Sequence, residues 1–386
     1  MNAARPDTEE ASAPQAPRLL HVALLLAACA GMVHHYGLID NLDSPIEQRS
    51  RDYVRYRAMA AAAPRIAVEV ESPYSYRILG PYLAGLLPFP DLTSFRVLAI
   101  AFSAVLVVGF YLFLCRYGIP GSAAALTVFF LMCNKFFFGF SLWNPFQIND
   151  VLTLCLLVLL YWAMLEGRWA VFGLALFLGA LTRETAALMI PVAFVRLAES
   201  RTLRRDWWKV AVAALPAVAA YIAIRCIVHP LKGTPLSEAF GRYVTKLVSP
   251  ASLFHLLVSS SWPFVLFPFV FYETSLKFFR GRKYAVVYLV LVFASTLFGA
   301  ENERLMGPTF IVFYPLLAVM IRDHFQGRRG ALALLCACAF ASTLSASFGA
   351  YKLPHAWLTL ALAGSATLIA TGAALWCRLS AARAGG

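Results

Sequence analysis

Charged residues are scarce in this sequence. Only 14% of its 386 residues are Asp, Glu, Lys or Arg, whereas 60% are apolar. A soluble domain carries about a quarter charged residues and about half apolar ones. So little charge could not cover a large water-exposed surface, which excludes a large soluble domain. The mean hydropathy of +0.70 indicates instead that much of the chain faces lipid.

Several common site motifs are missing as well. The eight cysteines lie in or beside apolar runs, and no loop carries a pair with metal-ligand spacing, so they are interpreted as small packing residues. There is no phosphate-binding loop, haem motif or Ser–His–Asp set. The net charge of +13 comes without a basic stripe interleaved with aromatic residues outside the apolar segments. Nucleic acid is therefore not an expected partner.

Long apolar runs dominate what the sequence does contain. Runs that can cross the roughly 30 Å hydrocarbon core of a bilayer predict about twelve helical spans. The sequence therefore predicts an all-α fold, a polytopic transmembrane helical bundle over residues 18–377, between a disordered N-terminal tail (1–17) and a short cytoplasmic tail (378–386). The predicted spans are 19–38, 92–115, 121–140, 146–165, 169–182, 185–197, 208–228, 253–272, 284–299, 305–321, 331–350 and 356–376.

Two regions depart from the pattern of simple spans. The runs 169–182 and 185–197 are short, so two half-depth helices that meet at Arg183 and Glu184 are an alternative to full spans. The run 78–90 is broken by five Gly or Pro residues. Broken backbone at membrane depth must be buried in protein, so this run is predicted to be re-entrant or interfacial, within an outer loop of residues 39–90.

The orientation follows from the positions of Lys and Arg. With the N-terminus inside, every inner connection carries positive charge, beginning with Arg116 and Arg168 and ending with Arg378. This is the distribution that the positive-inside rule requires. An even number of spans, with both termini inside, keeps this distribution of Lys and Arg on the inner side. We therefore expect a multi-pass protein of the plasma (inner) membrane.

Unusual ionisable residues gather on the predicted outer side. Carboxylates at a membrane boundary are costly and tend to be functional, and here separate chain segments deliver them to one side. This favours a site that opens to the outer, periplasmic face. An exposed polar loop is the alternative for residues 39–77, and a mutual ion pair at a helix break is the alternative for Arg183 and Glu184. The residues concerned include Asp40, Asp43, Asp52, Arg77, Asp150, Arg183, Glu184, Glu301, Glu303 and Arg304.

Asp52 lies in a segment, 47–63, that is predicted to form an amphipathic helix between the first two spans. Asp52, Tyr56 and Met59 fall on one stripe at helical spacing, together with Ala63, while arginines occupy the other faces. Such a helix lies in the interface plane, with its arginines near lipid phosphates. An acid on the apolar stripe faces the protein and is a candidate proton acceptor. The alternative is an aspartate that stabilises the helix dipole.

Two stretches resemble a known family. The pattern Asp52-x-x-x-Tyr56-x-x-Met59-Ala60, followed by Pro73-Tyr-x-Tyr-Arg77-Ile-Leu-x-Pro81, resembles the first outer loop of GT-C class glycosyltransferases related to dolichyl-phosphate-mannose mannosyltransferases. The stretches Asn144-Pro145…Asn149-Asp150 and Leu181-Thr-Arg183-Glu184 resemble their middle region. The resemblance covers residues 19–197. In the family the loop acid often lies nearer the first span, which makes Asp40 and Asp43 alternatives to Asp52.

The resemblance implies transfer of a sugar from a polyprenyl-phosphate carrier to a hydroxyl on the outer face. Asp52 would take the acceptor's proton, and cationic side chains would hold the phosphate. The expected partners are a lipid-linked sugar donor and membrane lipids. Some members use a divalent cation, so the cofactor stays open. Asp150, Glu184 and Glu301 could supply ligands, but their spacing is not diagnostic and no residue is assigned as a metal ligand. The implied substrate-binding residues are Tyr56, Arg77, Asp150, Arg183, Glu184, Glu303 and Arg304.

A transporter or lipid flippase is the main alternative function. Transporters place ionisable residues near the bilayer midplane. Here the predicted spans are nearly free of charge at mid-depth, and Arg96, Lys135 and Arg225 lie nearer their outer ends. This distribution favours an enzyme whose site opens at the surface. A catalytically silent protein with the same fold is the third possibility.

Overall fold

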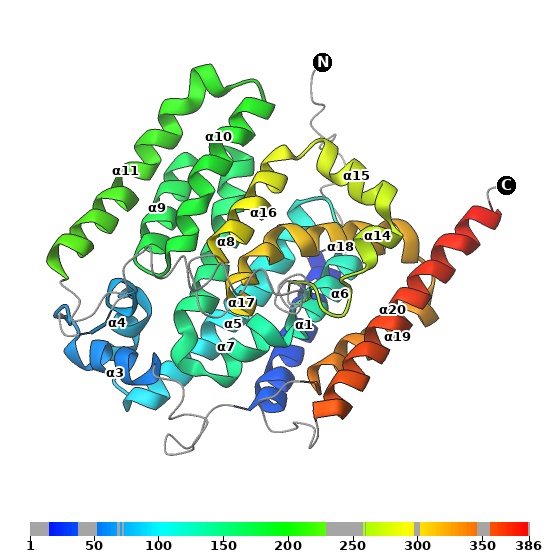
Figure 1. The fold of residues 1–386 in the computed structure, drawn as a ribbon, viewed down its shortest axis with the longest axis horizontal. Coiled ribbons are helices and arrows are strands. Elements are labelled where there is room, and N and C mark those ends of the chain that lie inside the picture. The colour runs from blue at the N-terminus through cyan, green and yellow to red at the C-terminus, as the bar shows by residue number, and fades with distance from the viewer. Residues whose placement is uncertain are drawn as a thin grey trace.

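The computed structural model describes residues 15–37, 52–67, 70–71, 73–228, 258, 260–296, 302–345 and 356–384. Within these ranges the regular secondary structure is helical, and no strand occurs. The helices form one bundle, in which long and shorter helices run alongside one another (Figure 1). The predicted polytopic helical bundle is confirmed.

Five helices of the described chain are long and apolar enough to cross a membrane. They are α1 (Gln15–Tyr36), α5 (Asp91–Arg116), α8 (Ile148–Glu166, extended by a preceding short turn), α11 (Leu203–Ile227) and α20 (Ala356–Ala384). The shorter helices are α6 (Gly121–Met132), α9 (Trp169–Ala180), α10 (Met189–Glu199), α16 (Lys283–Ser295), α18 (Phe310–Phe325) and α19 (Arg329–Thr343).

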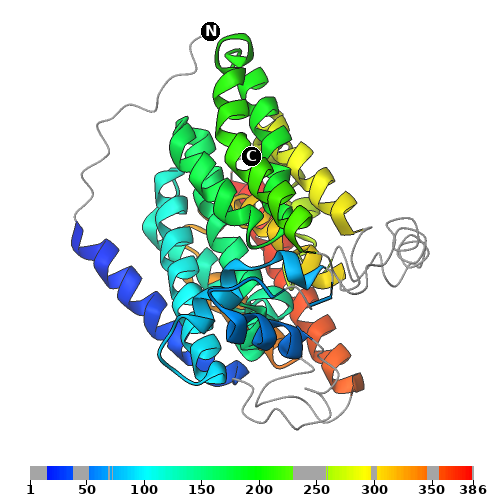
Figure 2. The same cartoon turned by 90° about the vertical axis from the view of Figure 1, so that its left-hand side faces the viewer.

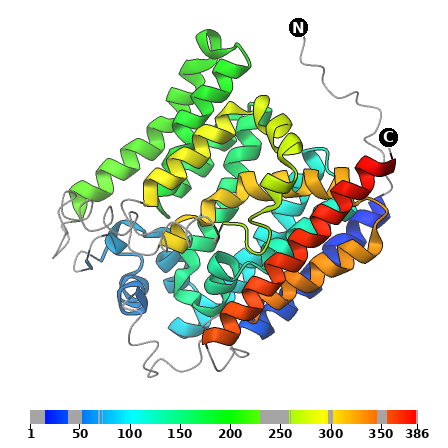
Figure 3. The same ribbon diagram turned by 45° about the vertical axis from the view of Figure 1, so that its right-hand side comes forward.

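Burial differs sharply between these helices. Helix α8 lies in the middle of the bundle between α5 and α9, and 78% of its apolar window is buried. Helices α1 and α11 lie outside, each with 22% of its window buried. The second view shows α1 along one edge, and the third shows α19 and α20 side by side (Figures 2 and 3). Large apolar side chains on the outer helices are exposed, such as Leu19 of α1 and Leu360 of α20, at 70% and 72%.

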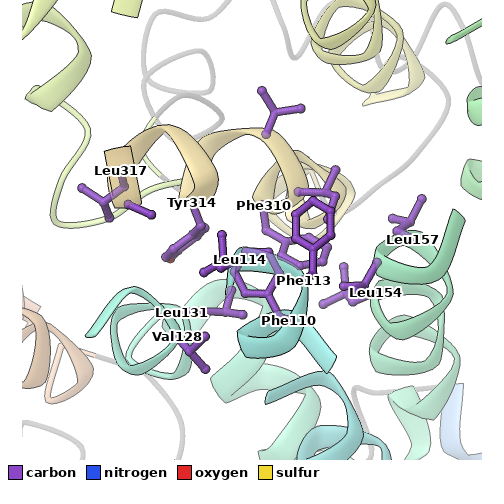
Figure 4. Packing of buried hydrophobic residues seen from close by; sticks show 14 of the residues in the cluster. Phe110, Phe113, Leu114, Val128, Leu131, Leu154, Leu157, Phe310, Tyr314 and Leu317 are labelled. Carbon is purple, nitrogen blue, oxygen red and sulfur yellow. The ribbon is translucent and has the colours of Figure 1, made fainter. Parts of the chain in front are cut away.

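The core joins four helices through interlocking aromatic and aliphatic side chains. Phe110 of α5 meets Phe310 of α18 with ring centroids 5.2 Å apart. Leu154 and Leu157 of α8 belong to the same buried cluster. The labelled members of this cluster are Phe110, Phe113, Leu114, Val128, Leu131, Leu154, Leu157, Phe310, Tyr314 and Leu317 (Figure 4).

The predicted span 121–140 is not one continuous α-helix. Helix α6 ends at Met132 and is followed by a π-helical turn, η3 (Lys135–Gly139), and by α7 (Phe140–Trp143). Asn134 explains the break, because its Oδ1 accepts a hydrogen bond from the backbone N–H of Phe136 at 3.0 Å. Its amide also donates to the hydroxyl of Tyr314 at 3.3 Å. A local side-chain bond of this kind competes with the helical backbone.

The predicted span 253–272 is also wrong where it is described. Residues 260–266 form turns, and α14 (Phe267–Val270) is a single turn before α15 (Tyr272–Arg280). Pro263 and Pro268 lack the N–H that would continue a helical ladder. Residues 253–257 and 259 of this prediction lie outside the described residues.

The outer-loop segment forms a small layer at one end of the bundle. It holds α3 (Asp52–Ala62), a 3₁₀ turn η2 (Tyr74–Tyr76) and α4 (Leu79–Gly85), which pack on one another and on α5 and α8 (Figure 2). With seven residues, α4 is too short to cross a membrane. Helices α3 and α4 touch closely, because a Cβ on Gly85 would lie 2.1 Å from the carbonyl oxygen of Ala60.

The opposite end of the bundle carries the basic connections. There Arg116 at the end of α5 donates to Glu166 at the end of α8, with Nε and Oε1 3.0 Å apart. The backbone N–H of Lys283 donates to Glu199 of α10 at 2.6 Å. These contacts bring together residues that the charge pattern assigned to the same side of the membrane. We call this the basic end, and the end with α3 and α4 the site end.

Candidate functional site

Two aspartates from distant parts of the chain are linked at the site end. Asp52 is the first residue of α3, and Asp150 lies in the first turn of α8. Gln147, in the 3₁₀ turn η4 (Pro145–Gln147), donates from Nε2 to Oδ2 of Asp52 at 2.5 Å. The guanidinium of Arg304, on α17 (Asn302–Leu305), donates to Oε1 of Gln147 and, from Nε, to Oδ2 of Asp150 at 2.8 Å.

Each carboxylate oxygen of Asp150 pairs with an arginine. Nη1 of Arg183 donates to its Oδ1 at 2.6 Å, while Nη2 of Arg304 lies 2.7 Å from its Oδ2. Asp150 is 8% exposed and Arg183 is 6% exposed. A carboxylate buried in this way is stable only because both oxygens meet positive charge. Asp150 therefore holds the two arginines in place and is poorly suited to accept a proton.

Asp52 is held more loosely. Besides Gln147 it meets Nη1 of Arg304 at 3.7 Å and Nη1 of Arg55 at 3.9 Å, both longer than a hydrogen bond. The predicted stripe of α3 faces the protein, since Tyr56 and Met59 are each 1% exposed. Tyr74 packs edge-on against Tyr56. Burial and then the charge of Asp52 raise the pKa of Tyr74 above its ordinary value.

A second cluster surrounds Glu184. Nη2 of Arg77 donates to its Oε2 at 3.2 Å, and Nη2 of Arg225 lies 3.7 Å from its Oε1. The guanidinium of Arg225 lies between the rings of Tyr76 and Tyr221, 4.3 and 3.3 Å from their centroids. Burial opposes the charge on Arg77, but Glu184 and weaker electrostatic neighbours hold the pKa of Arg77 above its ordinary value.

Arg183 and Glu184 do not pair with each other, which corrects the alternative of a mutual ion pair. The backbone of Arg183 is extended, with φ −161° and ψ 141°. Successive side chains of an extended chain point to opposite sides. Arg183 therefore turns toward Asp150 in the first cluster, and Glu184 turns toward Arg77 in the second.

Asn149 joins the two clusters through the backbone. Its Nδ2 donates to the carbonyl oxygen of Arg77 at 3.2 Å, and its Oδ1 accepts from the N–H of Gly80 at 3.1 Å. The start of α8 is thereby tied to the start of α4. Glycine is required at position 80, because a Cβ there would lie 2.4 Å from Oδ1 of Asn149.

The charges of the two clusters do not cancel. Among the side chains that the structure describes, five arginines face four carboxylates, which leaves one positive charge in excess within this set. The excess favours an anionic ligand such as a phosphate, for which arginine supplies paired donors. The arginines are Arg55, Arg77, Arg183, Arg225 and Arg304, and the carboxylates are Asp52, Glu71, Asp150 and Glu184.

The described structure brings together most of the residues predicted for the site. Glu303 lies on α17 beside Arg304, but the structure does not describe its side chain. Asp40, Asp43 and Glu301 lie outside the described residues. Those found in or against the two clusters are Asp52, Tyr56, Arg77, Asp150, Arg183, Glu184 and Arg304.

Several members of the clusters were not predicted. Gln147 and Asn149 are polar residues at the start of an apolar span, and Asn149 also belongs to the Asn149-Asp150 stretch of the resemblance, but neither was assigned to the site. Arg225 was placed near an outer span end, but nothing in the sequence indicated that it meets Glu184. Arg55 and Glu71, which form an ion pair, appeared only as two among many loop charges.

The two clusters do not fit a divalent cation as they stand. Both oxygens of Asp150 are occupied by guanidinium groups, whose charge would repel a metal ion. In the part of the chain that the structure describes, no group of three or more His, Cys, Asp or Glu residues is placed to hold a metal. We derive no step of the chemistry through a metal.

The arrangement of the helices is GT-C-like. Two crystal structures of ArnT from Cupriavidus metallidurans share it. The structure bound to undecaprenyl phosphate has a TM-score of 0.53 and 12% identity, over 95% of this chain and 76% of that chain. The apo structure has a TM-score of 0.54 and 13% identity, over 93% and 74%. No family model and no curated protein sequence matches the chain.

This likeness shows a shared fold. The predicted relationship to mannosyltransferases in particular stays a prediction, as does each residue's role.

Proposed function

We propose that the chain is a membrane glycosyltransferase that moves a sugar from a polyprenyl-phosphate carrier to a hydroxyl acceptor. The GT-C-like fold supports this, as does the undecaprenyl phosphate bound by one of the ArnT structures. The observation that carries the proposal is a loosely held carboxylate, Asp52, beside a net-positive arginine cluster. A base and an anion site in one place are what this reaction needs.

The proposed step is a displacement at the anomeric carbon of the sugar. The acceptor oxygen forms the new bond to that carbon as its proton passes to Asp52. The bond from the anomeric carbon to the phosphate oxygen breaks, and the polyprenyl phosphate leaves. The phosphate changes from a diester to a monoester and gains one negative charge, which Arg304, Arg183 and Arg77 are placed to stabilise.

Asp52 is the better candidate for the base than Asp150. Asp52 accepts a close hydrogen bond from a neutral amide and also interacts with the neutral phenol of Tyr74, while its arginine neighbours stand at 3.7 and 3.9 Å. Asp150 meets two guanidinium groups at 2.6 and 2.7 Å. A carboxylate neutralised so closely is a weak proton acceptor. The two acids thus divide the work between proton acceptance and arginine positioning.

The site end is proposed to face the outside of the inner membrane. The basic end carries Arg116, Lys277 and Arg282, and the positive-inside rule places such connections in the cytoplasm. The site end lies at the other ends of α5 and α8. A donor carried by a polyprenyl lipid would then approach from the outer leaflet.

A carrier-release assay tests the proposed function. The full chain in liposomes is given a panel of undecaprenyl-phosphate-linked sugars with an envelope extract as acceptor, and free undecaprenyl phosphate is measured by mass spectrometry. Release should fall by roughly 10²–10⁴-fold in Asp52→Asn, the usual contribution of a general base. Full release in Asp52→Asn would refute this assignment, and loss in Asp40→Asn or Asp43→Asn alone would move the base within the loop.

Binding can be tested without knowing the sugar. Undecaprenyl phosphate itself serves as the probe, with bound lipid counted by native mass spectrometry. Arg77→Ala and Arg183→Ala should weaken binding, whereas Arg116→Ala at the basic end should not, because its side chain is 66% exposed and lies at the far end of α5. Equal binding by all three variants would contradict the anion site. Lipid binding with no carrier release would favour the silent or transporting alternatives.

A further inference from the structure

Gln147 occupies the position between the proposed base and the arginine cluster. It is 2% exposed, although it is a polar residue at the start of a spanning helix. Its Nε2 donates to Asp52, and its Oε1 accepts from Arg304. A single amide orientation satisfies both partners, because a carboxylate only accepts and a guanidinium only donates. The side chain therefore connects two groups of opposite charge in a defined direction.

The backbone that carries Gln147 is held on both sides. Asn144 caps the turn η4 by accepting from the N–H of Phe146 at 3.2 Å, and Pro145 fixes the first residue. Phe146 is 1% exposed and packs on Phe95 with ring centroids 4.8 Å apart. Such packing leaves Gln147 little freedom, so its amide stays aimed at Asp52 before any ligand arrives.

The two oxygens of Asp52 have different surroundings. Oδ2 receives the amide of Gln147 and faces Arg304 at 3.7 Å. Oδ1 faces Arg55 at 3.9 Å, beyond hydrogen-bond distance. The remaining titratable neighbours, Tyr56 and Tyr74, come from α3 and η2.

From this geometry we propose that Gln147 is a positioning residue for the transfer reaction. It holds Oδ2 of Asp52 and links it to Arg304, so that Oδ1 is the oxygen that takes the acceptor's proton. The same link couples the base to the phosphate site, because Arg304 contacts both Gln147 and Asp150. The chemical role of Gln147 rests on the proposed function. Its hydrogen bond to Asp52 does not depend on that function.

Three variants separate positioning from simple structural support. Gln147→Ala removes both contacts, and Gln147→Glu keeps the acceptor for Arg304 but replaces the donor with a second acid. Gln326→Ala, an exposed glutamine at the basic end, is the matched control. In the carrier-release assay Gln147→Ala should lower kcat by roughly 10–100-fold with a smaller change in KM, since Arg77 and Arg183 remain to hold the phosphate.

The pH profile gives a readout that a structural role would not move. In Gln147→Glu the acid limb of the release rate should shift up by about one pH unit, because neighbouring carboxylates resist ionising together. An unshifted profile in Gln147→Glu, or wild-type kcat in Gln147→Ala, would overturn the proposal.

Carbodiimide labelling tests the hold on Asp52 without any sugar donor. Dicyclohexylcarbodiimide modifies protonated carboxyl groups, and peptide mapping reports labelling at Asp52 and, as internal control, at Asp91. Gln147→Ala should raise labelling of Asp52 by roughly tenfold, about the effect of one hydrogen bond to a charged group, and leave Asp91 unchanged. Unchanged labelling of Asp52 would overturn the proposal. If the wild-type protein released no carrier but Gln147→Ala still raised the labelling of Asp52, the proposed function would be refuted and the positioning of Asp52 by Gln147 would stand.

Discussion

Removing Asp150 should destabilise the protein far more than removing an exposed acid. In Asp150→Ala, Arg183 and Arg304 lose the carboxylate that they meet at 2.6 and 2.7 Å. Their side chains are 7% and 12% exposed, so water cannot replace the lost partner. Breaking a buried ion pair by deleting one member costs about 3–5 kcal/mol. Because Arg183 loses its carboxylate partner while Arg304 keeps its contact with Gln147, we expect a loss within this range.

A second substitution should recover part of the loss. Arg183→Met combined with Asp150→Ala removes one stranded charge and fills the space with an apolar side chain. Replacing a buried ion pair by apolar residues is often close to neutral. Arg304 still lies 3.7 Å from Asp52 and can move toward it. The double variant should therefore be more stable than Asp150→Ala alone.

Thermal aggregation in detergent, followed by size-exclusion chromatography, measures these differences. The control is Glu166→Ala at the basic end, where Glu166 is 29% exposed and its partner Arg116 is 66% exposed. An exposed pair contributes at most about 1 kcal/mol. If Asp150→Ala and Glu166→Ala lowered the aggregation temperature equally, Asp150 would not be the buried centre of an arginine cluster.

Two further predictions concern packing and orientation. Gly80→Ala should destabilise the protein by about 1–3 kcal/mol in the same thermal assay, because the added Cβ would overlap Asn149. Gly109→Ala is the control and should be tolerated, since a Cβ there meets nothing within 4 Å. Equal stability of the two variants would contradict the close contact of α4 and α8. In a cysteine-free background, a cysteine at position 57, in place of Arg57, should react with an impermeant thiol reagent from outside the cell. A cysteine in place of Lys277 should react only after permeabilisation, and the reverse result would invert the proposed topology.

The sequence by itself determined the class of protein and much of its helical pattern. Apolar runs longer than a bilayer core require spanning helices, and the helix starts at Asp91 and Trp169 lie within one residue of the predicted limits. The buried face of α3, with Tyr56 and Met59, was also predicted, because the spacing of residues along a helix depends only on the local sequence. Gly and Pro between residues 78 and 90 limited α4 to a short helix for the same local reason.

The sequence predicted which residues belong to the candidate site better than it predicted which of them contact one another. Asp150 and Arg183 could be singled out because charged residues beside apolar spans are rare, and Asp52 because it falls on the apolar stripe of a predicted helix. That Arg183 meets Asp150, and that Glu184 turns the other way, depends on an extended backbone at one residue and on how α8 and α9 pack.

Only the tertiary structure decided which side chains meet. Gln147 lies 95 positions from Asp52 and 157 from Arg304 along the chain, and no sequence spacing relates them. Their contact depends on the packing of α3 against η4, the turn that carries Gln147 at the start of α8. Local patterns specify helices and their faces, whereas long-range contacts depend on the simultaneous packing of every helix between them.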